Sequence, residues 1–413
     1  MRPRPYQQLV IDSMLSRDKG QLIVPTGGGK TFCMIQDAKR LIENSSEATI
    51  IIVAPRILLA QQLSAEFLEH LGEKHIHPQL NVLHVHSGDT CHYSTTKTDE
   101  IKEWINKTPS NKLIFTTYHS LHRVSDSDIE VDTIYFDEAH NSVQKNFIES
   151  VDYFSLVARR SYFFTATPKH SLTPMKAGMN DPDIFGEVLV SVKARDLIDY
   201  GAICSPKVTA HELQVCGVTN IHERDCKYLL NVLDKQAHME RVLVTAKRTK
   251  DINNLMKHSS FFVKAMKRDY AVMHITSKYG AYINNKKVDR QTFFETLREW
   301  GSDVNKKFIC FHHSILSEGI NVNGLTSCIL MRNMDYISMA QTIGRVIRID
   351  PRDRARMSSG ELKAGDIPSY TKGVGLLCVP ILGKVGISTH RRLQTVVDTI
   401  FEKGEPAISV VSR

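Results

Sequence analysis

Short runs of apolar residues recur through the first half of the chain, and amphipathic helical patterns separate them. Strands are predicted at 22–24, 49–54, 81–86, 112–116, 133–136 and 161–165. Most of these runs are continuously apolar and do not alternate with polar residues, which is typical of parallel strands covered on both faces. Helices are predicted at 31–43 and again after residue 56, where apolar residues recur at helical spacing. This alternation of strands and helices predicts a doubly wound parallel α/β sheet.

The same alternation returns in the second half of the chain after an interruption. From 170 to 206 the periodicity fades, and proline and glycine residues punctuate the segment. Further strands are predicted at 207–213, 241–245, 270–276, 307–311, 326–331 and 375–380, and helices at 289–300 and 389–401. The polar segment 352–372 is predicted to be a surface loop. We therefore predict two α/β domains, 1–170 and 207–413, joined by a linker at 171–206.

Composition narrows the class of protein only a little. The 413 residues are 42% hydrophobic and 24% charged, as in ordinary globular proteins. The 53 Lys and Arg against 45 Asp and Glu give a net charge of +8, which weakly favours a polyanionic partner such as nucleic acid. The eight cysteines include no C-x-x-C pair and predict reduced thiols. With no signal-peptide pattern or apolar run of membrane-spanning length, we expect a cytoplasmic protein of a bacterium or phage-infected host, or a nucleoplasmic one, not a secreted one.

The segment QLIVPTGGGKT at 21–31 carries the first candidate chemistry. An apolar strand leads into a glycine-rich loop, and a helical pattern begins directly after it, which is the order of a phosphate-binding P-loop. The residues expected to cradle phosphate are Thr26, Gly27, Gly28, Gly29, Lys30 and Thr31. Lys30 is expected to reach the β- and γ-phosphates, and the Thr31 hydroxyl to ligate Mg²⁺. Val24 stands where the usual pattern has its first glycine.

Adjacent carboxylates follow another predicted strand of the same domain. Asp137 and Glu138, in the sequence DEAH, come directly after the strand at 133–136. The carboxyl end of a parallel strand faces the ligand crevice of such a sheet, so Asp137 is a candidate Mg²⁺ ligand. Glu138 is the candidate base that orients and deprotonates the attacking water. A surface acidic turn is the alternative, but the P-loop in the same domain makes it the weaker interpretation.

Seven short motifs occur in the order found in superfamily 2 helicases, which the chain resembles from residue 4 to residue 348. They are VPTGGGKT, APR, TTYHS, DEAH, TATP, SEGIN and QTIGRVIR. The layout is most similar to the phage UvsW and XPB group, which shares its core with restriction-enzyme motor subunits. The resemblance implies two RecA-like, doubly wound parallel-sheet domains in tandem, with an ATP cleft between them. It also accounts for Val24, because this superfamily commonly writes the loop as P-T-G-x-G-K-T.

The resemblance assigns roles to further residues of the first domain. Gln7 matches the residue that reads adenine, and a side-chain amide can pair with both the donor and the acceptor of that base edge. A polar residue at a helix start is the alternative for Gln7. Motifs that contact the phosphate backbone of nucleic acid correspond to Pro55, Arg56, Thr116 and Thr117. His140, Thr165 and Thr167 match the elements that couple ATP hydrolysis to movement along the strand, although a plain strand-end turn remains the alternative for TAT.

In the second domain the resemblance points to the segments SEGIN and QTIGRVIR. Gln341, Arg345 and Arg348 are spaced four and three residues apart, which predicts that they share one face of a helix. Arg348 is expected to be the arginine finger that stabilises the transition state, with Arg345 supporting it. A solvated basic helix face is the alternative. Gly319 and Asn321 match residues that contact nucleotide, although the family more often has aspartate where Asn321 stands.

The function implied is an ATP-dependent DNA helicase or translocase that moves 3′-to-5′, with ATP and Mg²⁺ as cofactors. Single-stranded, forked or branched DNA is the expected partner, and RNA is a rival substrate. A second rival is the ATPase motor module of a restriction or defence complex, in which a partner would cleave, because the sequence has no nuclease or methyltransferase signature. The histidines and cysteine at 75, 77, 84, 86, 91 and 92 are interpreted as structural more than metal-binding, because no paired ligand spacing occurs.

Overall fold

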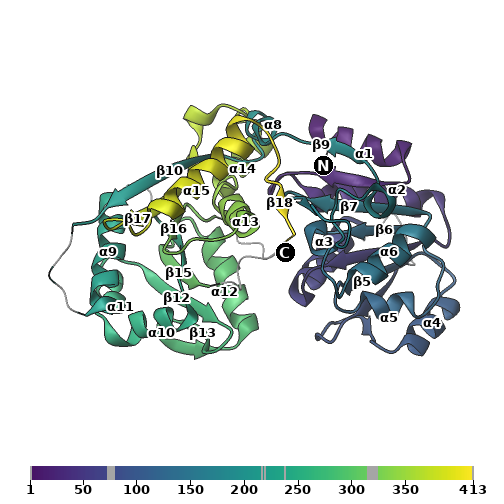
Figure 1. Cartoon of the computed structure of the whole chain (residues 1–413), viewed down its shortest axis with the longest axis horizontal. Helices are drawn as coiled ribbons and strands as arrows, with labels where there is room; N and C mark the ends of the chain where they lie inside the picture. The colour runs from purple at the N-terminus through teal and green to yellow at the C-terminus, as the bar shows by residue number, and fades with distance from the viewer. Residues whose placement is uncertain are drawn as a thin grey trace. The chain divides into compact units, whose positions relative to one another are not determined.

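The computed structural model describes residues 2–71, 80–214, 217, 220–236, 239–313 and 324–411. The chain divides into two compact units (Figure 1). Unit 1 comprises Met1–Lys193 and Pro406–Arg413, and unit 2 comprises Ala194–Glu405. None of the described helices is both long and apolar enough to cross a membrane.

Unit 1 is built on a sheet in which every strand pair is parallel. The spatial order is β4-β3-β5-β2-β6-β7-β1-β9. The strands are β1 (Lys19–Ile23), β2 (Thr49–Ala54), β3 (Asn81–Val85), β4 (Tyr93–Ser94), β5 (Lys112–Thr117), β6 (Thr133–Phe136), β7 (Arg160–Thr165) and β9 (Val188–Ser191). Every residue of β2, β5 and β6 is buried, as expected for central strands covered on both faces.

Helices cover both faces of this sheet. They are α1 (Pro5–Ser16), α2 (Lys30–Asn44), α3 (Ile57–Leu71), α4 (Thr98–Lys107), α5 (Leu121–Ser125), α6 (Ile148–Val157) and α7 (Pro182–Phe185). Ile114 of β5 belongs to a core cluster that includes residues of α4, α5 and α6. The next residue, Phe115, packs edge-on against Phe67 of α3, with ring centroids 5.6 Å apart. Because successive side chains of a strand point to opposite faces, α3 lies across the sheet from α4, α5 and α6.

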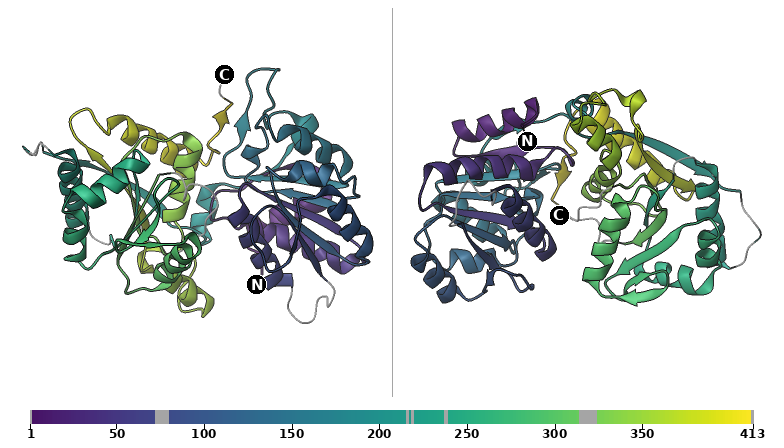
Figure 2. Two further views of the ribbon diagram at one scale, coloured as in Figure 1. Left: turned by 90° about the horizontal axis from the view of Figure 1, so that it is seen from below. Right: turned by 180° about the vertical axis from the view of Figure 1, so that it is seen from behind.

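The segment predicted as a linker is partly ordered structure of unit 1. β9 pairs with β1 and adds an edge strand to the sheet, and α7 packs beside α6. The last part of the chain also returns to unit 1, where β18 (Ser409–Val410) pairs in parallel with β8 (Lys169–His170). Figure 2 shows this yellow C-terminal segment from two further directions. The predicted linker 171–206 is therefore divided between unit 1 (171–193) and unit 2 (194–206), and 406–413 belongs to unit 1.

Unit 2 has a mixed sheet with the order β10-β17-β16-β11-β15-β12-β13-β14. The strands are β10 (Ser205–Glu212), β11 (Arg241–Thr245), β12 (Ala271–Thr276), β13 (Gly280–Ile283), β14 (Lys286–Val288), β15 (Phe308–His312), β16 (Ser327–Leu330) and β17 (Val374–Ile381). The pairs from β10 to β12 are parallel, and β13 and β14 form an antiparallel hairpin at the edge. The predicted α/β class with two parallel-sheet domains is confirmed, with this hairpin as an addition.

Helices also cover both faces of the second sheet. They are α8 (Ala194–Asp199), α9 (Ile221–Lys235), α10 (Thr249–His258), α11 (Phe261–Met266), α12 (Arg290–Ser302), α13 (Tyr336–Val346), α14 (Pro351–Ser358) and α15 (Ile387–Val397). Residues of α9, α10 and α11 share one core cluster with the strands. α13 packs on β16 and β17, and α15 on β10 and β17.

The prediction of a surface loop at 352–372 is wrong for the start and the end of that segment. α14 begins at Pro351, and the side chain of Asp350 caps it by accepting a hydrogen bond from the Arg352 amide. Asp353 within α14 and Lys372 after it are both buried. The polar composition was a misleading signal, because these charged side chains are satisfied by partners inside unit 2.

Candidate nucleotide-binding site

The P-loop connects β1 to α2 in unit 1, as the sequence predicts. Gly27 and Gly29 both have positive φ angles, 89° and 83°, a backbone conformation that side chains other than glycine rarely adopt. The Gly28 amide donates a hydrogen bond to the Pro25 carbonyl over 2.9 Å. Gly29 is the N-cap of α2, and Lys30 is its first residue. The loop therefore presents Lys30 and Thr31 at a helix N-terminus, where backbone N–H groups favour an anion.

Gln7 of α1 is a structural support of this loop. Its side-chain Nε2 donates to the Gly28 carbonyl over 3.1 Å, while Oε1 accepts the Arg4 amide over 2.9 Å. A Cβ built on Gly29 would lie 2.5 Å from Gln7 Nε2, so the close approach itself requires glycine. The amide retains a second N–H and a second lone pair for a base edge. Reading of adenine by Gln7 stays a prediction beside this observed role.

The two carboxylates of the DEAH sequence lie at the end of β6, next to the P-loop lysine. Lys30 Nζ lies 3.3 Å from Glu138 Oε1. Glu138 has φ 47° and ψ 53°, in the left-handed region, which is uncommon for a residue with a side chain and often marks a functional position. The Asp137 amide donates to the Val53 carbonyl, and the Tyr118 hydroxyl donates to the Asp137 carbonyl. This backbone anchoring fixes the point from which both carboxylates extend.

The Asp137 carboxylate is in an environment that suits a cation. Burial raises the pKa of Asp137, the neighbouring negative charge of Glu138 raises it further, and Lys30 opposes both effects. A divalent cation at this position would offset the cost of holding two carboxylates close together. The Asp137 carboxylate and the Thr31 hydroxyl supply oxygen donors, which Mg²⁺ prefers. These residues therefore fit the predicted Mg²⁺ site.

His140 joins the DEAH turn to the TAT segment that follows β7. His140 Nδ1 lies 3.1 Å from Thr165 Oγ1 and 3.4 Å from Thr167 Oγ1. The same nitrogen lies 3.6 Å from Glu138 Oε2. All three residues are buried. The His140 ring therefore contacts both Glu138 and the TAT segment. The predicted coupling role requires such a contact, because a change at Glu138 would have to be transmitted to Thr165 and Thr167.

The four residues predicted to contact nucleic acid differ in how they are presented. Arg56 is exposed between β2 and α3, and Pro55 before it is buried. Thr116 is fully buried, and its hydroxyl donates to the Val85 carbonyl over 3.0 Å. Thr117 is also buried, with its hydroxyl 3.4 Å from Ser120 Oγ. Arg56 is thus the one of these four side chains that reaches solvent.

In unit 2 the predicted helical face of Gln341, Arg345 and Arg348 is only partly present. Gln341 and Arg345 lie on α13 and are buried. The prediction that Arg348 shares their helix is wrong, because α13 ends at Val346 and Arg348 forms an isolated antiparallel bridge with Ile203. The carbonyls at and after its end bond to groups outside the helix, Val346 to Lys372 and Ile347 to Cys204. Gly319 and Asn321 lie outside the described residues.

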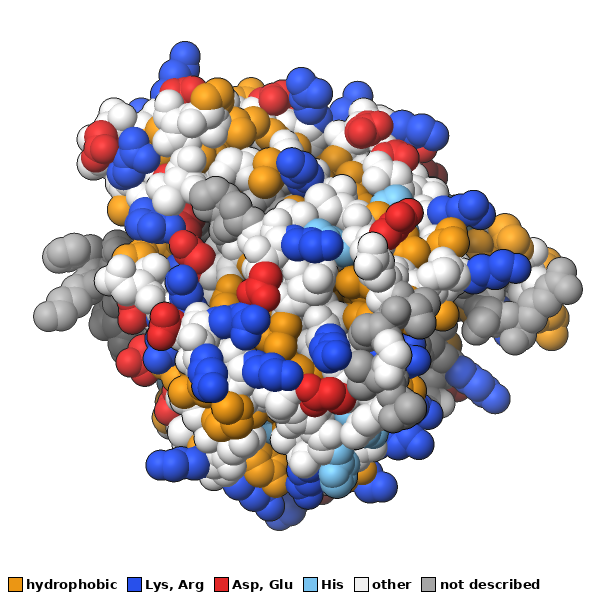
Figure 3. All heavy atoms as spheres, turned by 90° about the vertical axis from the view of Figure 1, so that its left-hand side faces the viewer, with side chains coloured by type: hydrophobic (Ala, Val, Ile, Leu, Met, Phe, Trp, Pro, Cys, Tyr) orange, Lys and Arg blue, Asp and Glu red, His pale blue; other side chains and the backbone are white. Residues whose placement is uncertain are grey.

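Of the predicted histidine cluster, His84 contacts both His86 and His92, and His75 and His77 lie outside the described residues. His84 Nδ1 lies 2.9 Å from His86 Nε2, and burial lowers the pKa of His84 to about 4. No group of three or more potential metal ligands occurs among the described residues. On the face shown in Figure 3, Lys and Arg side chains are mixed with acidic ones. The net positive charge therefore does not identify a nucleic-acid surface on that face.

Comparison with known proteins supports the fold. Residues 1–170 match the family model of the type III restriction enzyme res subunit. The match covers less than half of the chain. No curated protein sequence matches it.

Three solved structures show what the whole chain is similar to. The ATP-dependent type ISP restriction-modification enzyme LlaBIII bound to DNA matches with a TM-score of 0.70 and 16% identity, over 100% of this chain and 31% of LlaBIII. Mss116p bound to ssRNA and AMP-PNP matches with a TM-score of 0.60 and 15% identity, over 100% of this chain and 75% of Mss116p. The E. coli DExH-box NTPase HrpB matches with a TM-score of 0.56 and 13% identity, over 98% of this chain and 44% of HrpB. The two units therefore have RecA-like helicase folds, and the chain spans less than a third of LlaBIII.

Gln7 provides a test of the loop support. Replacing Gln7 with alanine removes the hydrogen bond to the Gly28 carbonyl, and we expect the KM for ATP to rise by about 5–30-fold, the equivalent of one buried hydrogen bond. If Gln7 also reads adenine, the variant loses its preference for ATP over GTP; if it only supports the loop, both nucleotides weaken equally. Gln8→Ala is the matched control, because Gln8 is exposed on the same helix and bonds only to Asp12 among the described contacts. An unchanged KM for both nucleotides contradicts the support role.

Proposed function

We propose that the chain is the ATP-hydrolysing motor of a superfamily 2 helicase or translocase, driven along DNA. This proposal rests on one contact: Lys30 Nζ of the P-loop lies 3.3 Å from Glu138 Oε1 of the DEAH sequence, at the ends of β1 and β6. A half-buried glutamate with a left-handed backbone, held beside a phosphate-binding lysine, is an arrangement suited to activating water next to a γ-phosphate.

Each of the candidate residues of unit 1 has a separate proposed role at the nucleotide. Lys30 would bind the β- and γ-phosphate oxygens while its ammonium remains within reach of Glu138. Thr31 and Asp137 would hold Mg²⁺, which neutralises charge on the phosphates when it is bound. Glu138 would orient the attacking water and take its proton. His140 would transmit the change at Glu138 to Thr165 and Thr167, because it contacts all three side chains.

Unit 2 contributes positive charge to the same reaction in this proposal. Arg348 would stabilise the charge that develops on the transferred phosphoryl group, and buried Arg345 would support it. Gly319 and Asn321 keep their proposed nucleotide contacts. Cycles of ATP binding and hydrolysis change the relative affinity of two conformations for DNA, which is what a ligand-driven motor requires.

DNA is the favoured substrate, with RNA as the rival. The match of residues 1–170 to a restriction-enzyme family, and the similarity to LlaBIII bound to DNA, support DNA and a role as the motor module of a larger restriction or defence assembly. The similarity to Mss116p bound to ssRNA supports the rival. The UvsW and XPB likeness favours movement from 3′ to 5′.

A panel of nucleic acids separates these substrates. We expect single-stranded and forked DNA to raise the rate of ATP hydrolysis several-fold more than RNA of the same sequence, at equal salt. Displacement of a labelled strand from forks with 3′ or 5′ tails measures unwinding and its direction in the same samples. Stimulation by RNA alone would overturn the assignment to DNA and leave the ATPase assignment intact.

A further inference from the structure

Lys372 is a buried lysine in the segment that leads into β17. Only 7% of its surface is exposed, and its ammonium group is surrounded by backbone oxygens. Nζ donates hydrogen bonds to the carbonyls of Leu325, Val346 and Arg348, at 2.7, 2.5 and 2.7 Å. An ammonium group has three N–H donors and no acceptor, so these three bonds use its full capacity. The three partially negative carbonyl oxygens therefore compensate for the loss of water around the buried ammonium charge.

Two of those carbonyls belong to the place where α13 ends. Val346 is the last residue of the helix, and Arg348 follows two positions later. The last carbonyls of a helix lack partners within it, and they lie at the negative end of the helix dipole. A cation at this end satisfies them and favours termination of the helix there. Lys372 thus holds the backbone at the end of α13 through the Val346 and Arg348 carbonyls.

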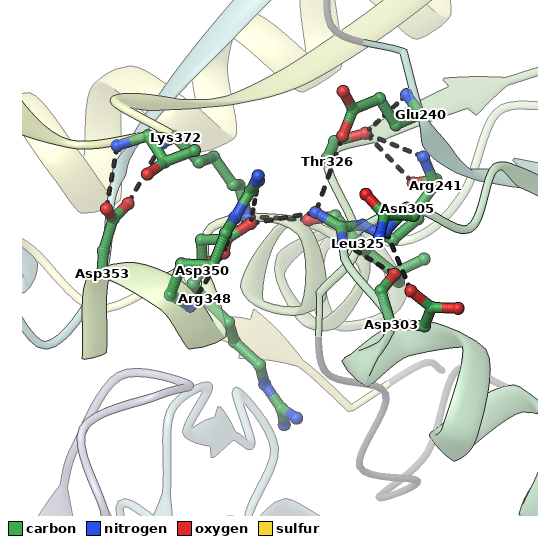
Figure 4. A network of polar contacts seen from close by, with 12 residues as sticks. Glu240, Arg241, Asp303, Asn305, Leu325, Thr326, Arg348, Asp350, Asp353 and Lys372 are labelled. Carbon is green, nitrogen blue, oxygen red and sulfur yellow. Dashed lines mark hydrogen bonds and ion pairs between the residues drawn. The ribbon is translucent and has the colours of Figure 1, made fainter. Parts of the chain in front are cut away.

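Besides Lys372, the segment at Ile203 and Cys204 also binds the backbone around Arg348. Ile203 forms an antiparallel bridge with Arg348, and the Cys204 amide donates to the Ile347 carbonyl over 2.6 Å. Cys204 Sγ lies 3.0 Å from the Lys372 carbonyl, within donating distance. Figure 4 shows the result: the Arg348 side chain extends away from the polar network that holds its own backbone. The three methylene groups and the guanidinium of Arg348 therefore extend from a backbone that is held on both sides.

Lys372 is itself anchored by Asp353, a buried aspartate of α14, and a second buried aspartate, Asp350, interacts with it electrostatically. Asp353 accepts hydrogen bonds from the Thr371 and Lys372 amides, at 2.9 and 3.1 Å. Asp350, the N-cap of α14, accepts from Arg241 Nη2 over 2.9 Å. Both aspartates and Arg241 have no exposed side-chain surface. Asp353 and Lys372 therefore link α14 to the end of α13, and Asp350 links the start of α14 to Arg241 of β11.

We propose that Lys372 is a positioning residue for Arg348, which fixes the backbone of the arginine finger through its bond to the Arg348 carbonyl. This inference rests on the proposed function of Arg348. Lys372 touches neither nucleotide nor the reacting atoms in this account. It acts on the rate of hydrolysis through the direction in which Arg348 points, and an error of about 1 Å in such a group costs on the order of 10²-fold in rate.

The charge on Lys372 makes this positioning sensitive to pH. Burial lowers the pKa of Lys372 to about 8, so its proton is lost as the pH rises through that value. A neutral amine keeps two N–H donors, and one of the three carbonyls then loses its bond. The charged and titratable groups that face Lys372 from the packed elements are Cys204, Arg241, Arg348, Asp350 and Asp353. Burial raises the pKa of the Cys204 thiol to about 11, and hydrogen bonds from Arg352 hold the pKa of Asp350 below its usual value, so neither titrates near pH 8.

Four variants of the full chain test the proposal by steady-state ATP hydrolysis with saturating DNA. They are Lys372→Met, Lys372→Arg, Arg348→Ala and the double variant Arg348→Ala with Lys372→Met. Lys363→Met is the control, because Lys363 is exposed in the segment between α14 and β17. Thermal melting and binding of a fluorescent ATP analogue confirm that each variant folds and binds nucleotide.

We expect Lys372→Met to lower kcat by about 10–100-fold with little change in KM, and Lys372→Arg to recover most of that loss. In the Arg348→Ala background, Lys372→Met should cost nothing more, because the two residues act through one group. The wild-type kcat should fall as the pH rises through about 8, and Lys372→Arg should lack that fall.

Additive effects in the double variant, or the same alkaline fall in Lys372→Arg, overturn the positioning role. If Lys372→Met does not fold, the pH profiles of the wild type and Lys372→Arg decide alone. A wild-type chain without ATPase activity, or an Arg348→Ala variant with full activity, overturns the proposed function instead.

Discussion

Replacing Glu138 with glutamine lowers kcat for ATP hydrolysis by about 10²–10⁴-fold, the range expected when a general base is removed. The substitution keeps the size of the side chain and its capacity to hydrogen-bond, but the amide cannot take a proton from the attacking water. The backbone at Glu138 is left-handed, and glutamine meets the same steric limits there as glutamate, so the fold of the turn is retained. Lys30 loses a negative partner 3.3 Å away and remains available to phosphate. Affinity for ATP should therefore be equal or higher.

The measurement pairs DNA-stimulated hydrolysis with equilibrium binding of a fluorescent ATP analogue. Glu130→Gln is the control, because the Glu130 side chain is 96% exposed in the same unit. A Glu138→Gln variant with wild-type turnover refutes the assignment of the base. Loss of both binding and turnover indicates instead that Glu138 holds the P-loop together through Lys30.

If Arg348 is the arginine finger that we propose, its replacement with alanine should lower kcat by about 10³-fold or more, because a finger stabilises charge that develops only in the transition state. KM should change little. Arg348 lies outside α13 and is half-buried, whereas Arg345 is buried within the helix. Arg345→Ala should therefore lower thermal stability as well as turnover, and Arg348→Ala should lower turnover alone.

Stopped-flow or steady-state hydrolysis, with melting temperatures for each protein, distinguishes the two arginines. Arg298→Ala on the exposed face of α12 serves as the control in the same unit. If the Arg345 variant loses turnover without loss of stability while Arg348→Ala stays active, the roles of the two residues are reversed.

The P-loop and the DEAH turn could be predicted from the sequence because their geometry is local. Gly27 and Gly29 adopt positive φ angles that glycine permits, and the strand, loop and helix around them are contiguous. Glu138 follows a buried strand directly, so its place at the strand end follows from the boundary of β6. Short-range patterns are sufficient when the residues that form the site are neighbours in the chain.

The end of α13 could not be predicted in the same way. The spacing of Gln341, Arg345 and Arg348 is helical, yet the helix stops at Val346. There Lys372 binds the Val346 and Arg348 carbonyls, and Ile203 pairs with Arg348. Both partners are far from α13 in sequence. Lys372 appeared to be part of a polar surface loop, and its burial depends on carbonyls and carboxylates that only the folded unit brings together. The sequence does contain a helix-start signal, Asp350 followed by Pro351, which could have predicted α14. It contains no comparable signal for the burial of Lys372.

Side-chain hydrogen bonds set a second limit. From the sequence, Gln7 and Thr116 are both predicted to contact a ligand. In the structure, the Gln7 amide donates to the Gly28 carbonyl, and the Thr116 hydroxyl donates to the Val85 carbonyl. Which polar groups remain available to a ligand depends on tertiary contacts. Such contacts decide between a supporting and a binding role.

The central claim is that this chain couples ATP hydrolysis to nucleic acid through Lys30, Asp137 and Glu138. The most direct test is the steady-state hydrolysis of Mg²⁺–ATP by the wild type and Glu138→Gln, with and without forked DNA. We expect DNA to raise the wild-type rate at least several-fold, and Glu138→Gln to show almost no turnover in either condition while still binding ATP. Hydrolysis that ignores both DNA and RNA, or that survives unchanged in Glu138→Gln, would contradict it.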